Sequence, residues 1–149
     1  FCFIGAMGQA GAFALGLAMA QKEKRVLLVT GDGELLMSLG ILATIANQGP
    51  KNLVLLVMDN ESYAETGGQP TATAGLTDLE QVARGCGIKE TATFQNEEES
   101  EEIRKMVYGR AGPVFMNIKV FAKPPDLVFP HSFDGVTAID RFRKSVLSN

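Results

Sequence analysis

The amino-acid sequence predicts an α/β domain, a three-layer sandwich in which helices flank both faces of a mostly parallel sheet. Three observations indicate this fold class. Short, continuously apolar runs, typical of strands that are buried on both faces, recur along the chain. Segments with helical patterning separate these runs, as in parallel sheets with helical crossovers. The chain has 149 residues and is 46% hydrophobic, which suffices for one domain with a real core.

The first 21 residues carry no charge and are rich in Gly and Ala. They predict a buried helix that packs closely through its small residues. A membrane span or a signal peptide is the alternative, but Gln9 interrupts the stretch and no basic segment precedes it. Because the chain begins at Phe1 within this organised stretch, we expect an N-terminal segment to be missing.

The next residues predict a strand, a helix and a second strand. Residues 24–30 (KRVLLVT) indicate a strand buried on both faces, and residues 35–48 (LLMSLGILATIANQ) a buried helix that is apolar nearly all round. Gly49-Pro50 marks a turn, after which residues 52–58 (NLVLLVM) repeat the strand pattern.

The remaining sequence continues the alternation. A helix begins after a predicted N-cap at Thr77-Asp78 and stops at Gly85 or Gly87. The later predicted elements are a weaker strand, an acidic surface helix, a clear strand and a last helix, at residues 89–94, 97–109, 112–120 and 136–147. The acids at the start of the surface helix suit the helix dipole, so we interpret them as a solvated face.

Composition excludes some classes of function. The net charge is −3 and the basic residues are scattered, which argues against a nucleic-acid surface. Cys2 and Cys86 have neither metal-ligand spacing nor the number needed for a disulfide framework. We therefore expect a cytoplasmic protein that binds neither nucleic acid nor membrane.

Two polar loops follow the first two predicted strands, at residues 31–34 (GDGE) and 59–71. The carboxyl ends of parallel strands open into the ligand crevice of such sheets, so these loops are the candidate site. Gly31 and Gly33 permit close backbone approach to a phosphate at the start of a helix. Asp32 would repel that phosphate unless a divalent cation lay between them, and Mg²⁺ prefers such oxygen ligands. The alternative is a simple turn with Asp32 as N-cap.

The GDG of residues 31–33, followed by Asp59-Asn60 after the next strand, resembles the signature of the thiamine-diphosphate enzymes. Many members have Asn-Asn where this sequence has Asp-Asn. The resemblance implies the thiamine-diphosphate-binding fold over residues 1–149, with thiamine diphosphate and Mg²⁺ as cofactors. It also implies that no pyrimidine-binding domain is present in this chain.

The resemblance also implies roles for individual residues. The side chains of Asp32 and Asn60 and the carbonyl of Ser62 would bind Mg²⁺. Met7 would wedge under the cofactor, with a core position as its alternative. The implied cofactor-binding residues are Gly5, Met7, Gly31, Asp32, Gly33, Glu34, Asn60, Ser62, Ala64 and Glu65, of which Gly33, Glu34 and the backbone of residues 62–65 would hold the diphosphate. Thr66, Gln69 and Thr71 would adjoin the substrate, unless residues 67–71 are only a structural loop.

The segments MGQAGAFALGLAMA and ESYAETGGQPT resemble one branch, which contains sulfopyruvate and phosphonopyruvate decarboxylases. This implies a non-oxidative 2-oxo-acid decarboxylase that releases an aldehyde and CO₂. No catalytic residue is assigned to this chain, because the activating glutamate of the family belongs to the pyrimidine-binding part. The implied partner is an alpha-type subunit or a missing N-terminal half, in a homodimer of this chain or an α2β2-type assembly.

Three other functions remain open. A beta-type subunit of a 2-oxo-acid oxidoreductase would normally belong to a complex with iron-sulfur clusters, and no cysteine cluster supports it here. A non-catalytic module that binds thiamine diphosphate is the second. A dinucleotide-binding Rossmann domain is the third, but Gly5, Gly8 and Gly11 do not have the required spacing. His131, the only histidine, is interpreted as a surface or packing residue rather than as a proton donor.

Overall fold

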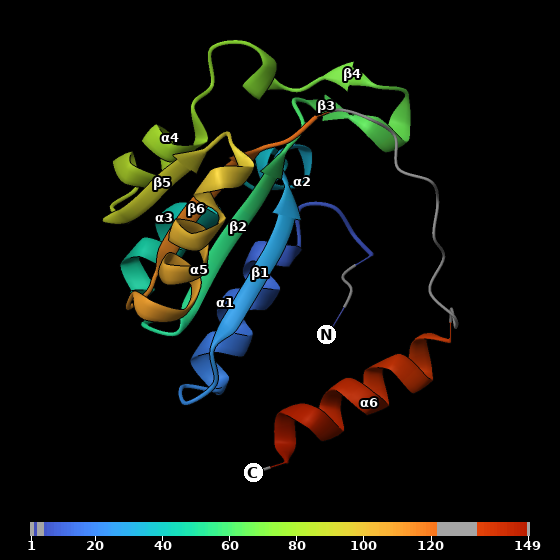
Figure 1. The fold of residues 1–149 in the computed structure, drawn as a ribbon. Helices are drawn as coiled ribbons and strands as arrows, with labels where there is room; N and C mark the ends of the chain where they lie inside the picture. The colour runs from blue at the N-terminus through green and yellow to red at the C-terminus, as the bar shows by residue number, and fades with distance from the viewer. Residues whose placement is uncertain (1, 3–4, 122–133, 149) are drawn as a thin grey trace.

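A four-stranded parallel sheet forms the centre of the fold (Figure 1). Its strand order is β1-β2-β6-β5, with bounds Val26–Gly31, Leu53–Asp59, Val114–Lys119 and Glu90–Phe94. The structure is a computed structural model and describes Cys2, residues 5–121 and residues 134–148. Each strand lies on a predicted run, including the weaker one, so the predicted α/β sandwich with a parallel sheet is confirmed. Pro124, Pro125 and His131 lie outside the described residues.

Helices cover the sheet in two layers (Figure 1). One layer holds four helices, with bounds Ala10–Ala20 for α1, Asp32–Leu36 for α2, Ile41–Gln48 for α3 and Leu79–Gly85 for α4. They share a core with one face of the sheet, in which Leu35, Leu42, Ile45, Leu55 and Phe115 are fully buried. The other layer is α5 (Ser100–Gly109), which buries Met106 and Val107 against the opposite face.

The two predicted buried strands differ in burial. Strand β2 is covered on both faces, as predicted. Strand β1 is an edge strand, and the prediction that both of its faces are buried is wrong. Its Leu27 and Val29 are 43% and 58% exposed, because the core beneath α5 draws on β2, β5 and β6 but not on β1.

The single helix predicted over residues 35–48 is two helices, α2 and α3. The break lies at residues 37–40, where the amides of Met37 and Ser38 bond carbonyls three residues back, to Glu34 and Leu35. Ser38 and Gly40 are poor helix formers, which favours this tight turn. The predicted all-round burial is also wrong, since α3 buries only Leu42 and Ile45.

Helix α1 packs through small residues, as predicted, but on one face only. A Cβ at Gly11 would lie 3.0 Å from Ile41 Cγ2, so the two helices meet closely there. The opposite face exposes Phe13 and Met19, which corrects the expectation of a wholly buried helix. No helix in the described part of the chain has both the length and the apolar character that crossing a bilayer requires.

The last helix, α6 (Gly135–Leu147), lies apart from the sheet layers (Figure 1). Its Phe142 ring lies 6.0 Å from that of Phe13. Lys24 Nζ donates to the carbonyls of Ser145, Val146 and Ser148 at its carboxyl end, where a helix dipole favours a cation.

The segment between β2 and α4 is more ordered than a simple loop. It forms a short hairpin and two 3-10 turns, namely β3 (Ser62–Tyr63), η1 (Ala64–Thr66), β4 (Gln69–Pro70) and η2 (Ala72–Ala74). Asp78 then caps α4 as predicted, because its Oδ1 accepts from the amide of Gln81 at 3.0 Å. A further 3-10 turn, η3 (Glu97–Glu99), precedes α5.

Candidate cofactor and metal site

The two predicted site loops leave the sheet side by side. Strands β1 and β2 are parallel neighbours, and Gly31 pairs with Met58 in register. Asp32 and the Asp59-Asn60 pair therefore emerge at the same edge, next to the β3–β4 hairpin (Figure 1). This common edge is the condition for a ligand that both loops share.

Asp32 is a buried carboxylate, 1% exposed. Its Oδ2 accepts from Thr71 Oγ1 at 2.5 Å and lies 3.1 Å from Thr73 Oγ1. These contacts leave Oδ1 without a donor among the described residues, and no described lysine or arginine pairs with the carboxylate. A buried ionised group without a counter-charge is costly, so this carboxylate calls for a cation.

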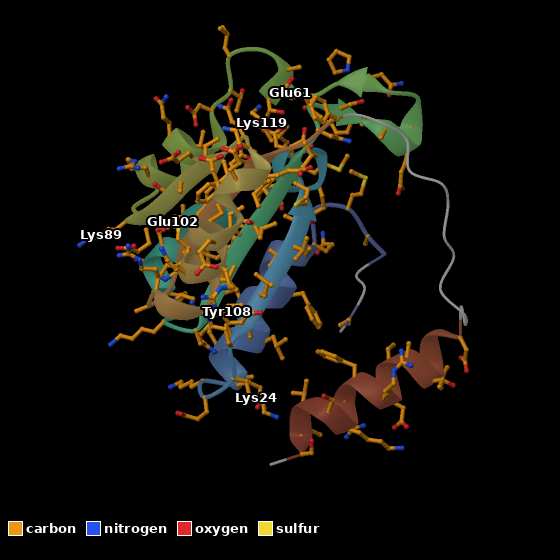
Figure 2. All side chains as sticks on the ribbon, viewed as in Figure 1. Lys24, Glu61, Lys89, Glu102, Tyr108 and Lys119 are labelled. Carbon is orange, nitrogen blue, oxygen red and sulfur yellow. The ribbon has the colours of Figure 1, made fainter. Side chains whose placement is uncertain are left out.

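Asp59, in contrast, has a lysine of its own. Its Oδ2 lies 2.9 Å from Lys119 Nζ and accepts from Asn117 Nδ2 at 3.1 Å, while its Oδ1 accepts from Thr73 Oγ1 at 2.7 Å. Figure 2 shows Lys119 beside Glu61, its second carboxylate partner, at 2.6 Å. The positive charge of Lys119 balances the Asp59 carboxylate. This explains how the chain accommodates a carboxylate where many members of the resembled family have an amide.

The pair is reflected in two pKa shifts. Burial alone would raise the pKa of Asp59, but hydrogen bonds from Lys119, Thr73 and Asn117 outweigh it and hold that pKa below its ordinary value. Burial alone would lower the pKa of Lys119, yet Glu61 and Asp59 raise it. Both groups are therefore charged at neutral pH.

Asn60 and Ser62 lie in one tight turn. Asn60 Oδ1 accepts from the amide of Ser62 at 3.1 Å, an Asx turn, and the intervening Glu61 has a left-handed backbone with φ 58°. An amide oxygen has two lone pairs, so Asn60 keeps one for a further ligand. The turn thus presents a side-chain oxygen and nearby backbone carbonyls at the same edge as Asp32.

Glu34 has a structural role that the sequence did not reveal. Its Oε1 accepts from the amide of Ala10 at 3.0 Å, at the start of α1, and its Oε2 accepts from Thr30 Oγ1 at 2.6 Å. The carboxylate therefore ties α1 to the end of β1. Only the backbone of Glu34 is left for the predicted diphosphate contact.

Thr71 is placed differently from the other predicted substrate neighbours. Thr66 and Gln69 are exposed, and Gln69 Nε2 donates to the carbonyl of Thr66 at 3.0 Å. Thr71 is 4% exposed and its hydroxyl faces Asp32. The structure therefore gives Thr71 a carboxylate partner inside the protein, and its predicted place beside the substrate stays a prediction.

Four other predicted cofactor residues are accessible, whereas Gly33 is buried. Gly5, Met7, Ala64 and Glu65 are exposed, and Met7 is 46% exposed just before α1. This exposure does not fit the alternative of a core position for Met7. Its predicted place under the cofactor stays a prediction.

Comparison with known proteins decides the family. Residues 2–118 match the family described as thiamine pyrophosphate enzyme, C-terminal TPP binding domain. The chain belongs to this family. The predicted resemblance to the thiamine-diphosphate (thiamine pyrophosphate, TPP) enzymes is thereby confirmed.

Individual relatives of this TPP-binding domain include decarboxylase subunits. It is 44% identical over 102 residues to sulfopyruvate decarboxylase subunit beta of Methanocaldococcus jannaschii, covering 68% of this chain and 53% of that protein. It is 40% identical over 147 residues to the subunit of the same name in Methanothermobacter thermautotrophicus, covering 98% and 75%. Phosphonopyruvate decarboxylase of Streptomyces viridochromogenes is 35% identical over 120 residues, 80% of this chain and 30% of that protein. The chain thus spans about half to three quarters of these beta subunits.

A solved structure supports the same fold. A putative thiamin diphosphate-dependent enzyme from Mycobacterium smegmatis superposes with a TM-score of 0.67 at 26% identity, covering 78% of this chain and 23% of that one. The TPP-binding domain described here is thus similar to part of a larger enzyme.

The residues at the shared edge fit Mg²⁺ and a diphosphate. Asp32, Asn60 and the Ser62 carbonyl offer only oxygen ligands, which Mg²⁺ prefers, and it completes its shell with water and phosphate oxygens. Among the described residues, no group of three or more His, Cys, Asp or Glu could hold a metal by itself. A site with few protein ligands, completed by the diphosphate, is consistent with this finding.

Gly33 is a position near the predicted site where a side chain has little room. A Cβ built there would lie 2.7 Å from Tyr63 Cδ1 and Cε1. We expect Gly33→Ala to lower the free energy of unfolding by about 1–3 kcal/mol, the usual cost of overpacking. Chemical denaturation measures this loss, and Tyr63→Ala in the same chain is expected to relieve the clash. Gly40→Ala, whose Cβ meets nothing within 4 Å, is the control; equal stabilities of the two alanine variants would contradict the expectation.

The Asp59–Lys119 pair predicts how stability depends on pH. Because the folded-state pKa of Asp59 lies below its ordinary value of 3.8, its stabilisation is present above that pH and is lost as the pH falls through the folded-state pKa. The folded-state pKa of Lys119 lies above 10.5, so its stabilisation is present below that pH and is lost as the pH rises through the folded-state pKa. Denaturant unfolding across the acidic range checks the first loss, which Asp59→Asn should largely remove.

Proposed function

We propose that this chain is the diphosphate-binding part of a non-oxidative 2-oxo-acid decarboxylase that depends on thiamine diphosphate and Mg²⁺. Its substrate is sulfopyruvate or phosphonopyruvate, and its products are an aldehyde and CO₂. The observation that carries this proposal is 40% identity to a sulfopyruvate decarboxylase beta subunit over 98% of this chain. The buried Asp32, which has no counter-charge among the described residues and emerges at the same sheet edge as Asn60, supports it from the structure.

The residues of the chain bind and orient the cofactor. The Asp32 carboxylate, the Asn60 side chain and the Ser62 carbonyl hold Mg²⁺. The Gly31–Glu34 turn and the backbone from Ser62 to Glu65 hold the diphosphate, while Gly5 and Met7 support the ring end. When bound, thiamine diphosphate supplies the electron sink that decarboxylation requires.

The partner in this proposal is a pyrimidine-binding subunit, or an N-terminal half of the same polypeptide, that provides the activating glutamate. Two observations support a partner. The relatives are named beta subunits, and apolar surface lies exposed on α1 at Phe13 and Met19 and on β1 at Leu27 and Val29. Exposed apolar side chains on two elements are consistent with a contact to another chain. The assembly is of the α2β2 type or a homodimer of this chain, and it works in the cytoplasm.

The substrate anion needs donors that the substrate-side loop lacks. A sulfonate or phosphonate binds well to arginine or lysine, yet residues 62–76 contain neither. In this proposal the partner supplies these cations. Thr66 and Gln69 are the neighbours that this chain contributes.

The test is a reconstituted assay. The full-length protein is produced together with the product of the neighbouring upstream gene, and CO₂ release from sulfopyruvate and phosphonopyruvate is measured with thiamine diphosphate and Mg²⁺. Turnover of either acid, lost when either subunit is left out, is the expected result. Firm cofactor binding without turnover of any 2-oxo acid would instead indicate a non-catalytic binding module.

A further inference from the structure

We propose that Thr71 and Thr73 are positioning residues of the cation site, which fix Asp32 relative to the loop after β2. This inference rests on the cation site of the proposed function and adds two residues to it. Neither belongs to a β-strand of the central sheet; Thr73 lies in η2 and Thr71 immediately precedes it.

Four short contacts link the ends of β1 and β2 through these hydroxyls. Thr71 Oγ1 lies 2.5 Å and Thr73 Oγ1 3.1 Å from Asp32 Oδ2, Thr73 Oγ1 lies 2.7 Å from Asp59 Oδ1, and the two hydroxyls are 2.9 Å apart. Thr71 and Thr73 are 4% and 5% exposed. The connection is therefore buried and runs from one predicted metal loop to the other.

The hydroxyl protons do not suffice for all four contacts. Each threonine hydroxyl has one proton to donate, and an ionised carboxylate only accepts. The shortest distances assign the Thr71 proton to Asp32 and the Thr73 proton to Asp59. The 3.1 Å contact between Thr73 and Asp32, like the 2.9 Å contact between the two hydroxyls, then brings two oxygens together without a proton between them.

A cation at Asp32 offsets that repulsion. Asp59 already has Lys119 as its counter-charge, whereas Asp32 has none among the described residues. The threonines engage only Oδ2 of Asp32, so they hold the carboxylate in an orientation that leaves Oδ1 for the cation. Outer partners that orient a metal ligand typically change metal affinity by about ten- to hundredfold when they are removed.

The test is a Mg²⁺ titration of the full-length protein, assembled with its partner, at a fixed concentration of thiamine diphosphate. Thr73→Val and Thr71→Val keep the shape of the side chain but remove the hydroxyl. Each is expected to raise the Mg²⁺ concentration at half-saturation by about ten- to hundredfold. Thr73→Ser and Thr71→Ser keep the hydroxyl and should restore most of the affinity.

Two controls separate positioning from general stability. Asn117→Ala removes another buried donor to Asp59 but does not contact Asp32, so it should lower the denaturation midpoint in EDTA without changing the Mg²⁺ half-saturation. Thr77→Val changes a threonine of the same loop whose side chain makes no hydrogen bond to the described residues, and it should change neither quantity.

The outcomes distinguish the two proposals. If both valine variants bind Mg²⁺ as the wild type does, or if Asn117→Ala weakens binding as much as they do, the positioning role is overturned while the cation site stands. If Asp32→Asn also binds Mg²⁺ as the wild type does, the cation site of the proposed function falls as well.

Discussion

Replacing Asp32 with alanine is expected to abolish the Mg²⁺-dependent binding of thiamine diphosphate. The substitution removes a buried carboxylate that has no counter-charge among the described residues, so the proposed cation would lose the anionic ligand that this chain provides. Loss of an outer partner alone costs about ten- to hundredfold in metal affinity, so loss of the ligand should exceed about a hundredfold. Isothermal titration calorimetry of the assembled protein, with and without Mg²⁺, measures the difference.

The same substitution should leave the fold in place. In metal-free buffer the buried Asp32 carboxylate has no counter-charge among the described residues, and removing it relieves a desolvation cost. The threonine hydroxyls left behind lie 2.9 Å apart and can bond each other. Glu102→Ala changes an exposed side chain of α5 (Figure 2); it is the matched control and should change neither binding nor stability. Unchanged cofactor affinity in Asp32→Ala would refute the metal site.

Replacing Lys119 with methionine should destabilise the chain more than any surface change. It leaves the Asp59 carboxylate, whose side chain is fully buried, without its cation. Breaking a buried ion pair typically costs 3–5 kcal/mol, and because Lys119 is partly exposed we expect about 3 kcal/mol in the free energy of unfolding. Denaturant unfolding measures the loss.

A double variant tests the cause. Asp59→Asn together with Lys119→Met removes both charges and creates the Asn-Asn pair of many family members, so most of the stability should return. Lys105→Met breaks only an exposed pair with Glu102 and should cost less than about 1 kcal/mol. Additive losses in the double variant would show that the pair does not act as a unit.

Local patterns in the sequence were sufficient to predict most of the fold. The apolar runs at β1, β2 and β6 are continuous, and such a run is by itself typical of a strand that is buried on both faces. The same rule failed for the outer face of β1, because a run such as VLLV does not say whether a strand lies at the edge or in the middle of a sheet. The break between α2 and α3 was missed because apolar residues continue through Ser38 and Gly40.

The site divides in a similar way. The placement of Asp32 and Asn60 at one edge of the sheet could be predicted because each directly follows a strand, and neighbouring parallel strands end at one edge. Lys119 and Thr73 could not, since they meet Asp59 only through the strand order β2-β6 and the turn η2. The register of β2 against β6 is the information that the sequence lacked, because it makes Lys119 the direct cross-strand partner of Asp59.

The exposed edge of β1 affects the solubility of this chain when it is produced alone. Strand β1 lies at the edge of the sheet, so its outer backbone groups pair with no described strand, and the exposed side chains of Leu27 and Val29 lie on the same strand. Such an edge can act as a template for a strand of another molecule. Production of these residues by themselves therefore invites precipitation. A charged substitution such as Val29→Lys would act as a gatekeeper and keep such a preparation in solution.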